Sequence, residues 1–418
     1  MDKLQKSREI IDTADRQIAE LFAQRMEAAK CIAEYKAENN LSVCDTSREQ
    51  KIIQRNCQYV NENIVPYYAE FLKSTIEISK KYQNAVINPD SIFINSQNGD
   101  YEIIIEKGCL DNVGKHLNLN RQVLIVTDNG VPIEYAKAVS SHCLKPTILT
   151  VEQGENSKNI KTCEMLLKVM LTKGFTRTDC VVAVGGGVVG DLAGFAASIF
   201  MRGIDFYNIP TTLLSQLDSS IGGKTAVNFG SVKNSVGAFY PPKKVLIDIN
   251  TLKTLDKRQL ANGMAEAVKM TLTFDADLFE LIETEDVNSH LEEIIKKSLI
   301  IKKSVVELDE KESGLRKALN FGHTLGHAIE INTNLYHGEC VALGMIKMCG
   351  ENVRSRLIAV LKKLNLPTEI NINTSDLLNA IKHDKKSDGE FIDAVFVNEI
   401  GSFEIRKVKP EELLKEEV

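Results

Sequence analysis

The chain has 418 residues, more than a single typical hydrophobic core accommodates, so we expect about two or three domains. Its formal net charge is −6, and its basic residues are scattered along the sequence, which argues against a nucleic-acid-binding protein. Nine cysteines without a Cys-x-x-Cys pair fit a reducing compartment, and the N-terminus lacks the apolar core of a signal peptide, so we expect a cytoplasmic location.

Residues 1–88 are predicted to form an all-helical domain. This stretch contains almost no glycine or proline, and its apolar residues recur at helical spacing, as in Ile11, Ile18 and Leu21. We expect helices over residues 4–37, 46–61 and 66–82. Asp45 and Pro66 are typical helix-start residues. An aspartate side chain accepts hydrogen bonds from the free N–H groups at the start of a helix, and the N–H that a proline lacks would have no partner in the first turn.

Two arginines of the first predicted helix are too far apart to bind one small ligand within a single chain. Arg8 and Arg25 are seventeen residues apart, which corresponds to about 25 Å at roughly 1.5 Å per helical residue. A symmetric dimer could bring Arg8 of one chain close to Arg25 of the other. We therefore expect a homodimer, with a merely solvated polar face as the alternative.

Further polar residues along this domain complete a recognisable pattern. Lys36 follows on the same helix, the segment DTSRE begins at Asp45, and Ser79 and Gln83 lie one turn apart on the third helix. Over about eighty residues the pattern resembles the helical chorismate mutases, which are dimers with shared sites. The resemblance implies that chorismate is bound by Arg8, Arg25, Lys36, Asp45, Arg48, Glu49, Ser79 and Gln83.

The same resemblance implies how these residues act. Arg8 is the cation contributed by the neighbouring chain, Arg25 and Lys36 are the local cations, and Lys36 donates to the ether oxygen of chorismate. The rearrangement to prephenate needs no nucleophile, so cations that hold two carboxylates and a donor at the ether oxygen are sufficient. The alternative is a non-catalytic domain that binds chorismate or prephenate as a regulatory signal.

Residues 92–253 are predicted to form an α/β nucleotide-binding domain. Strand-like runs (YEIIIE, RQVLIVTD, PTILTV, CVVAV and KVLID) alternate with helical ones, a pattern typical of a largely parallel sheet. The run CVVAV leads into a loop from Gly185 to Gly190 that fits G-x-G-x-x-G between a strand and a helix. We expect Gly186 and Gly187 to let a pyrophosphate approach the backbone, with Asp191 near the helix start.

Residues 254–418 are predicted to be mostly helical. Asp256, with Gln259 three residues later, is a plausible helix start. The segment GMAEAVKM then places Glu266 and Lys269 one turn apart in an otherwise apolar helix. Burying a carboxylate and an ammonium there costs several kcal/mol unless a partner or an ion is present.

The segment LNFGHTLGHAIE, followed by HGECVALGM, has the residue types of a metal site. His323 and His327 are four residues apart, so on a helix both imidazoles would project from one face with Glu330. Imidazole nitrogens and carboxylate oxygens are the ligands of a catalytic zinc ion. Spacing alone therefore favours both helical histidines as ligands.

Several segments from about Ser91 to the C-terminus stand in one order that resembles the 3-dehydroquinate synthases, members of the sugar-phosphate cyclases. They are GGGVVGDLAGFAAS, MRGI, IPTTLLSQLDSSIGGKTAVN, KNSVGAFYPP and GMAEAVK, together with the histidine segments. The resemblance implies a divalent metal, zinc or cobalt, bound by Glu266, His323 and His337. His327 would then face the substrate instead of the metal.

The resemblance also implies the cofactor and substrate contacts. NAD would be bound by Asp128, Glu155, Lys158, Gly186, Gly187, Asp191, Thr211, Thr212, Asp218, Lys224 and Lys233. The substrate positions would be Lys224, Lys269, Lys302, Arg316, Asn320 and His327, with Asn234 at the cofactor boundary and Arg202 reaching the phosphate from the neighbouring subunit. A C-terminal lysine, Lys385 or Lys386, would close the site.

The implied activity is the conversion of 3-deoxy-D-arabino-heptulosonate 7-phosphate to 3-dehydroquinate and phosphate, in the shikimate pathway. In that family NAD oxidises a ring hydroxyl, which acidifies the adjacent C–H for phosphate elimination, and the hydride later returns. Alternatives are another sugar-phosphate cyclase or a polyol dehydrogenase of the same fold. The chain departs from the family at Ala226, where glycine is usual, and in a shorter helical domain.

Overall fold

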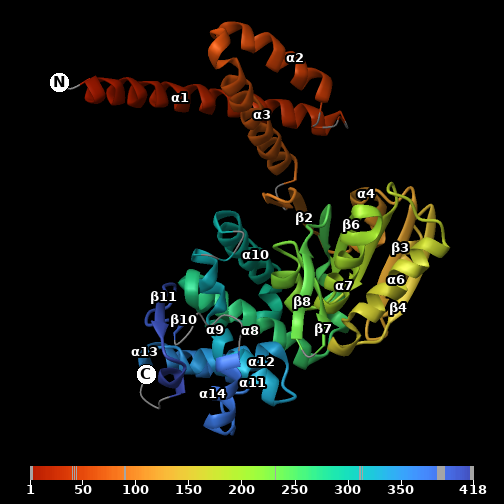
Figure 1. The fold of residues 1–418 in the computed structure, drawn as a ribbon, viewed down its shortest axis with the longest axis vertical. Coiled ribbons are helices and arrows are strands. Elements are labelled where there is room, and N and C mark those ends of the chain that lie inside the picture. The colour runs from red at the N-terminus through yellow and green to blue at the C-terminus, as the bar shows by residue number, and fades with distance from the viewer. Residues whose placement is uncertain are drawn as a thin grey trace. The chain divides into compact units, whose positions relative to one another are not determined.

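The computed structural model describes residues 3–39, 41, 43, 45–88, 91–230, 232–309, 312, 314–383 and 391–414. The chain divides into two compact units, Met1–Phe93 and Ile94–Val418 (Figure 1). In the part that the structure describes, no helix combines the length and the apolar character needed to span a membrane.

Among its described residues, the first unit has three α-helices: α1 (Lys3–Glu38), α2 (Thr46–Asn56) and α3 (Val65–Ile87). α1 packs against α3, where Ala29 and Ala33 of the first helix and Leu72 and Ile76 of the third are buried. Helix α2 is shorter than predicted, because the chain tightens into a 3₁₀ turn at Cys57–Tyr59. The helical character of residues 1–88 is confirmed for the residues described.

Both predicted helix starts in this unit are confirmed. The side chain of Asp45 accepts a hydrogen bond from the backbone N–H of Arg48, as expected of a cap at the start of α2. Pro66 lies in the first turn of α3, where its missing N–H has no cost.

The second unit is built on a sheet of order β1-β2-β9-β6-β5-β3-β4, in which β1 crosses the boundary between the units and the other six strands belong to the second. Each neighbouring pair in the order β2-β9-β6-β5-β3-β4 is parallel. Its strands are β1 (Ser91–Ile94), β2 (Tyr101–Ile105), β3 (Gln122–Asp128), β4 (Lys145–Val151), β5 (Cys180–Gly185), β6 (Asp205–Pro210) and β9 (Lys244–Ile247). The parallel α/β prediction is therefore confirmed. Sequence reasoning did not single out β6, whose run DFYNIP mixes polar residues and a proline with apolar ones.

Helices cover both faces of this sheet, as a parallel sheet requires. On β3, Leu124 and Val126 pack in one core with α6 (Ile160–Thr172) and α7 (Gly187–Ile199). The alternate residues Val123 and Ile125 pack in a second core with α4 (Val113–His116) and α5 (Ile133–Ser140). The strands β3, β5 and β6 are thus buried on both sides and rigidly placed.

A hairpin of β7 (Lys224–Phe229) and β8 (Val232–Phe239) lies apart from the main sheet. Ala226 sits in β7 opposite Gly237 and is absent from the residues with positive φ, so the departure from the usual glycine costs no backbone strain.

The remaining helices are gathered to one side of the sheet (Figure 1). They are α8 (Lys257–Phe274), α9 (Ala276–Thr284), α10 (Leu291–Leu308), α11 (His323–Asn332), α12 (His337–Lys347), α13 (Glu351–Lys363) and α14 (Thr374–His383). Asp256 caps α8 as predicted, accepting from the N–H groups of Arg258 and Gln259. An antiparallel pair, β10 (Ile392–Phe396) with β11 (Glu404–Val408), interrupts the helical pattern that the sequence indicated.

Candidate functional site

Predicted cofactor residues lie where three neighbouring parallel strands end. Asp128 is the last residue of β3, Gly186 and Gly187 follow β5, and Thr211 and Thr212 follow β6. Because parallel strands end at the same edge of a sheet, these positions lie along one edge. In open α/β sheets this edge is where ligands bind.

The glycines of the loop leave little space beyond their own backbone. A Cβ atom on Gly186 would lie 3.1 Å from Cγ2 of Thr212, and one on Gly187 would lie 3.1 Å from Oγ of Ser219. Helix α7 begins at Gly187, so its first N–H groups have no partner within the helix. At this helix N-terminus the absence of side chains on the glycines leaves a cradle beside free N–H groups. Such a cradle fits a pyrophosphate.

Polar groups beside this cradle form a connected network. The ammonium of Lys158 lies 2.5 Å from a carboxylate oxygen of Asp191 and donates to Oδ1 of Asn234 at 2.6 Å. Burial raises the pKa of Asp191, although the charge of Lys158 opposes this shift. Nδ2 of Asn228 donates to Oε1 of Glu155 at 2.8 Å, and Oδ1 of Asn228 accepts the backbone N–H of Asn234 at 2.8 Å, so Glu155 is connected to the same group. The structure thus brings four predicted residues of the α/β domain together.

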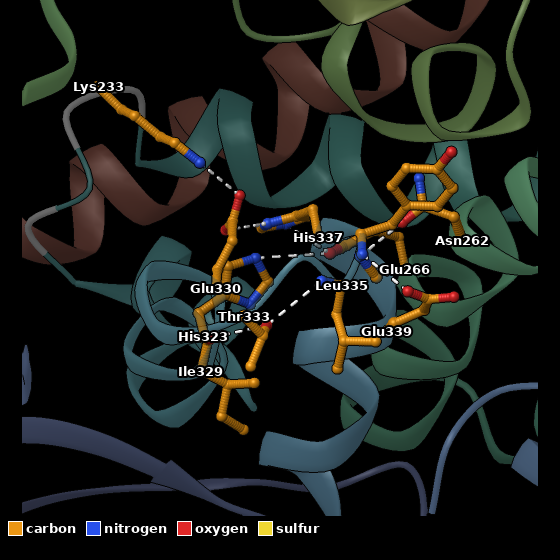
Figure 2. Close-up of polar contacts among 12 residues, drawn as sticks. Lys233, Asn262, Glu266, His323, Ile329, Glu330, Thr333, Leu335, His337 and Glu339 are labelled. Carbon is orange, nitrogen blue, oxygen red and sulfur yellow. Dashed lines mark hydrogen bonds and ion pairs between the residues drawn. The ribbon is translucent and has the colours of Figure 1, made fainter. Parts of the chain in front are cut away.

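Three predicted metal ligands meet in the helical part. Glu266 belongs to α8, whereas His323 and His337 are the first residues of α11 and α12. One ligand atom from each lies within 4.8 Å of those of the other two. The Nε2 atoms of the two histidines are 3.5 and 3.4 Å from Oε1 of Glu266 (Figure 2).

The carboxylate of Glu266 is buried with an ion-pair partner but without a hydrogen bond in the described structure. Both of its oxygens are inaccessible to solvent, and neither makes a hydrogen bond of acceptable geometry among the described residues. The ammonium of Lys269, also buried, forms an ion pair with it. A buried carboxylate facing two imidazole nitrogens is a donor set that a divalent metal of the zinc type satisfies.

The charges of this group are strongly coupled. Burial alone would raise the pKa of Glu266, but the charges of Lys269 and the histidines hold it well below its usual range. Burial and Lys269 lower the pKa of His323. Burial also opposes the charged form of His337, yet its contacts with Glu266 and Glu330 raise its pKa to about 10.

His327 and Glu330, the other two residues predicted on the metal-binding face, lie outside the group around Glu266. The ring of His327 is 5.4 Å from that of His323 and 5.9 Å from that of His337, measured between centroids. Glu330 is not part of the group around Glu266. It belongs to a second, overlapping group with His327 and His337. Helical spacing predicts contacts within a single helix, so it grouped His327 and Glu330 with His323. It could not include Glu266, which belongs to another helix.

A salt bridge holds the start of α12 against α8. The guanidinium of Arg258 donates to both carboxylate oxygens of Glu339, at 2.6 and 2.8 Å. Oδ1 of Asn262 accepts the backbone N–H of Gly338 at 2.6 Å (Figure 2). Since α8 also carries Glu266, these contacts fix the position of His337 relative to that carboxylate.

We expect Arg258→Met to lower the free energy of unfolding by about 2 kcal/mol, because the buried Glu339 carboxylate loses its cation. Burial would raise the pKa of Glu339, but Arg258 and the Tyr336 N–H lower it. The stabilisation is therefore present at neutral pH and is lost as the pH falls through the lowered pKa. Urea unfolding at pH 7 and at acidic pH measures both effects.

The control for this variant is Arg406→Met, which removes the exposed pair with Glu404. We expect it to change stability by less than about 0.5 kcal/mol. Equal losses in both variants, or a loss for Arg258→Met that does not depend on pH, would contradict the role of this clamp.

The predicted substrate residues are partly connected by contacts. Lys302 on α10 donates to the backbone oxygen and to Oδ1 of Asp218, at 2.6 and 2.7 Å, and burial lowers its pKa. Glu312 joins Lys224 and Asn320, at 2.8 and 2.7 Å. Sequence reasoning missed Glu312, because it stands in the charged run DEKES, where nothing distinguishes it from a solvated residue.

Arg316 and Arg202 differ in their exposure to solvent. Arg316 is buried, and its Nη2 would lie 2.8 Å from a Cβ on Gly222, which has φ +103°. Arg202 is exposed, with φ 69°, and no hydrogen bond or ion pair found among the described residues connects it to the others. Lys385 and Lys386 lie outside the described residues.

In the first unit, two predicted cations and two predicted polar residues are partly or wholly buried. Arg25 and Lys36 are half-buried, and each donates to a backbone carbonyl, at 3.3 and 2.8 Å. Ser79 and Gln83 are buried on α3, and Oε1 of Gln83 has no hydrogen-bond partner within the described structure. Such an acceptor is expected to receive a donor from a ligand or water.

The other predicted residues of this unit are more exposed. Arg8 and Arg48 are exposed to solvent. Glu49 is half-buried and lies 3.3 Å from the ammonium of Lys80. The side chain of Asp45 caps the start of α2.

Three protein-family models match the chain. The model of the 3-dehydroquinate synthase N-terminal domain matches residues 148–262, and that of the C-terminal domain matches residues 263–387. The model of chorismate mutase type II matches residues 7–84.

Curated relatives support the first two matches. The chain is 40% identical over 345 residues to the 3-dehydroquinate synthase of Streptococcus mutans, covering 77% of this chain and 97% of that protein. It is 41% identical over 354 residues to that of Thermoanaerobacter pseudethanolicus, with 78% and 99% covered.

Solved structures with the same fold include other cyclases. A 2-deoxy-scyllo-inosose synthase, solved with carbaglucose-6-phosphate, NAD⁺ and Co²⁺, is 28% identical with a TM-score of 0.72, covering 78% of this chain and 98% of that one. The 2-epi-5-epi-valiolone synthase of Streptomyces hygroscopicus, solved with NAD⁺ and Zn²⁺, is 28% identical with a TM-score of 0.68, covering 76% and 96%.

Proposed function

Because the chain belongs to the 3-dehydroquinate synthase family and contains a chorismate mutase type II domain, we propose that it catalyses two reactions. The synthase converts 3-deoxy-D-arabino-heptulosonate 7-phosphate to 3-dehydroquinate and phosphate, and the mutase converts chorismate to prephenate. The observation that carries the synthase proposal is the unsatisfied Glu266 carboxylate facing His323 and His337. Higher identity to the synthases than to the two other cyclases favours this substrate.

In this proposal Glu266, His323 and His337 bind zinc or cobalt, as the metals in the two solved cyclases suggest. When bound, the metal supplies Lewis-acid polarisation of substrate oxygens. The ion pair with Lys269 keeps Glu266 ionised and ready to coordinate. His327 lies beside both histidines but outside the Glu266 group, and in this proposal it acts on the substrate.

The loop at Gly186 and Gly187 binds the NAD pyrophosphate in this proposal, supported by its cradle at the start of α7. When bound, NAD supplies reversible hydride transfer. The remaining proposed contacts are Asp128, Glu155, Lys158, Asp191, Thr211, Thr212, Asp218, Lys224 and Lys233. We place the mutase domain at residues 1–88, the NAD-binding domain at 92–253 and the helical domain at 254–418.

The substrate carries a carboxylate and a phosphate, which cationic side chains bind through charge-assisted hydrogen bonds. We assign this role to Lys224, Lys269, Lys302, Arg316 and, from the neighbouring subunit, Arg202, with Asn320 as a further substrate contact and Asn234 at the cofactor boundary. Glu312 keeps Lys224 and Asn320 in place between turnovers, because it contacts both.

We further propose that the protein is a homodimer located in the cytoplasm. The first half of α1 exposes apolar side chains that its own unit does not cover: Leu4, Ile10, Ile11, Ile18 and Leu21 are between 47 and 70% exposed. A row of apolar residues on a helix needs a partner surface. A second copy of α1 would cover this row and bring Arg8 to the site around Arg25.

The test of the synthase proposal is phosphate release from the heptulosonate phosphate by purified protein with NAD, before and after chelation. We expect chelation to abolish release and added zinc or cobalt to restore it. Full activity in chelated protein would refute the metal assignment. Activity only with the substrates of the other cyclases would refute the substrate assignment.

A further inference from the structure

The carboxylate of Glu330 contacts two basic residues, one with each oxygen. Its Oε2 is 3.2 Å from Nδ1 of His337, and its Oε1 is 2.7 Å from the ammonium of Lys233 (Figure 2). The side chain of Glu330 is only 20% exposed. Glu330 thus lies between a proposed metal ligand and a residue of the β7–β8 hairpin.

The contact with His337 determines which ring nitrogen is free. An imidazole that binds a metal through one nitrogen carries its single proton on the other, and a carboxylate acceptor beside Nδ1 favours that proton at Nδ1. The lone pair is then on Nε2, which is the nitrogen that faces Glu266 at 3.4 Å. The contact also limits rotation of the ring, since His337 is otherwise at the first position of α12 with no preceding helical turn.

The contact with Lys233 holds Glu330 in that position. Lys233 precedes Asn234, whose Oδ1 accepts from Lys158 in the network beside the cofactor cradle. A carboxylate on α11 is therefore tied to the α/β domain at one oxygen and to the helical domain at the other.

We propose that Glu330 is a positioning residue that sets the tautomer and orientation of His337 for metal binding, with Lys233 holding its carboxylate. The inference rests on the proposed function, because it takes His337 as a metal ligand. It differs from the spacing argument, in which Glu330 is itself on the metal-binding face. Groups that orient metal-binding histidines typically change metal affinity by about 10- to 100-fold when they are removed.

The test measures the Zn²⁺ dissociation constant of purified full-length protein by competition with a chelating indicator. We expect Glu330→Ala to bind zinc about 10- to 100-fold more weakly than wild type. Glu330→Gln, whose amide oxygen still accepts from Nδ1–H, should lose less, and Lys233→Met should lose less than about 3-fold. The matched control is Glu283→Gln on α9, another partly buried carboxylate in an ion pair, which should bind zinc as wild type does.

Thermal unfolding of the metal-free variants shows whether each one folds. If Glu330→Ala does not fold, Glu330→Gln carries the test, because it too should bind zinc more weakly than wild type. Folded Glu330 variants with wild-type zinc affinity would overturn the inference while leaving the proposed function intact. A wild-type chain that binds no zinc or cobalt would overturn the proposed metal site itself.

Discussion

We expect His337→Ala to reduce 3-dehydroquinate formation by at least about 1,000-fold, because it removes one of three proposed ligands of a metal whose Lewis-acid contribution is worth several kcal/mol. Prephenate formation should remain unchanged. The proposed mutase residues belong to the unit Met1–Phe93, whereas His337 belongs to the other unit. The measurement is a pair of assays on one preparation, phosphate release with NAD and prephenate formation from chorismate.

Bound metal should be quantified in the same preparation, because the expected loss follows from metal loss. His290→Ala is the control. His290 directly precedes α10, pairs with Glu293 three residues later, and is distant in sequence from the proposed ligands. We expect this variant to retain metal and both activities. Equal loss of both activities in His337→Ala would show that the two units do not function independently.

Local sequence patterns predicted the parts of the fold that depend on local physics. The strand β5 and the start of α7 follow from a β-branched run that ends in glycines. The caps at Asp45 and Asp256 follow from side chains that accept the first N–H groups of a helix. The position of the cofactor residues follows from their place at the ends of neighbouring parallel strands.

Contacts between distant segments could not be predicted in the same way. Helical periodicity places Glu330 with His323 and His327, and it cannot show that Glu266 approaches from α8 instead. The link from Glu330 to Lys233 joins residues 97 positions apart. The role of Glu312 depends on Lys224, 88 positions away. These contacts arise only when the domains pack together.

The resemblance to the synthases supplied what periodicity lacked, because it named Glu266, His323 and His337 as one set before their geometry was known. The structure places ligand atoms of these residues within 4.8 Å of one another. Their identity as metal ligands stays a prediction, and His337→Ala tests it.

The second large effect is expected for a substitution in the first unit. We expect Arg25→Ala to cost the mutase roughly 3 kcal/mol or more of transition-state stabilisation, since it removes a cation that holds a substrate carboxylate. Synthase activity should not change. A mutase-inactive wild type whose synthase kinetics respond to chorismate or prephenate would instead support the regulatory alternative. Lys73→Ala, at an exposed basic residue of α3, is the control and should retain both activities.

Mixing two inactive variants tests whether the mutase site is shared between chains. Arg8→Ala and Arg25→Ala should each be inactive alone, because every site of either homodimer lacks one cation. In a heterodimer both lesions fall in one of the two sites, so the other site keeps both arginines and is intact. Random exchange of equal amounts makes about half of the dimers mixed, so roughly a quarter of the wild-type mutase activity should return. Activity that stays at the level of the parents, in a sample where mass spectrometry shows heterodimers, would exclude a site that takes Arg8 from the neighbouring chain.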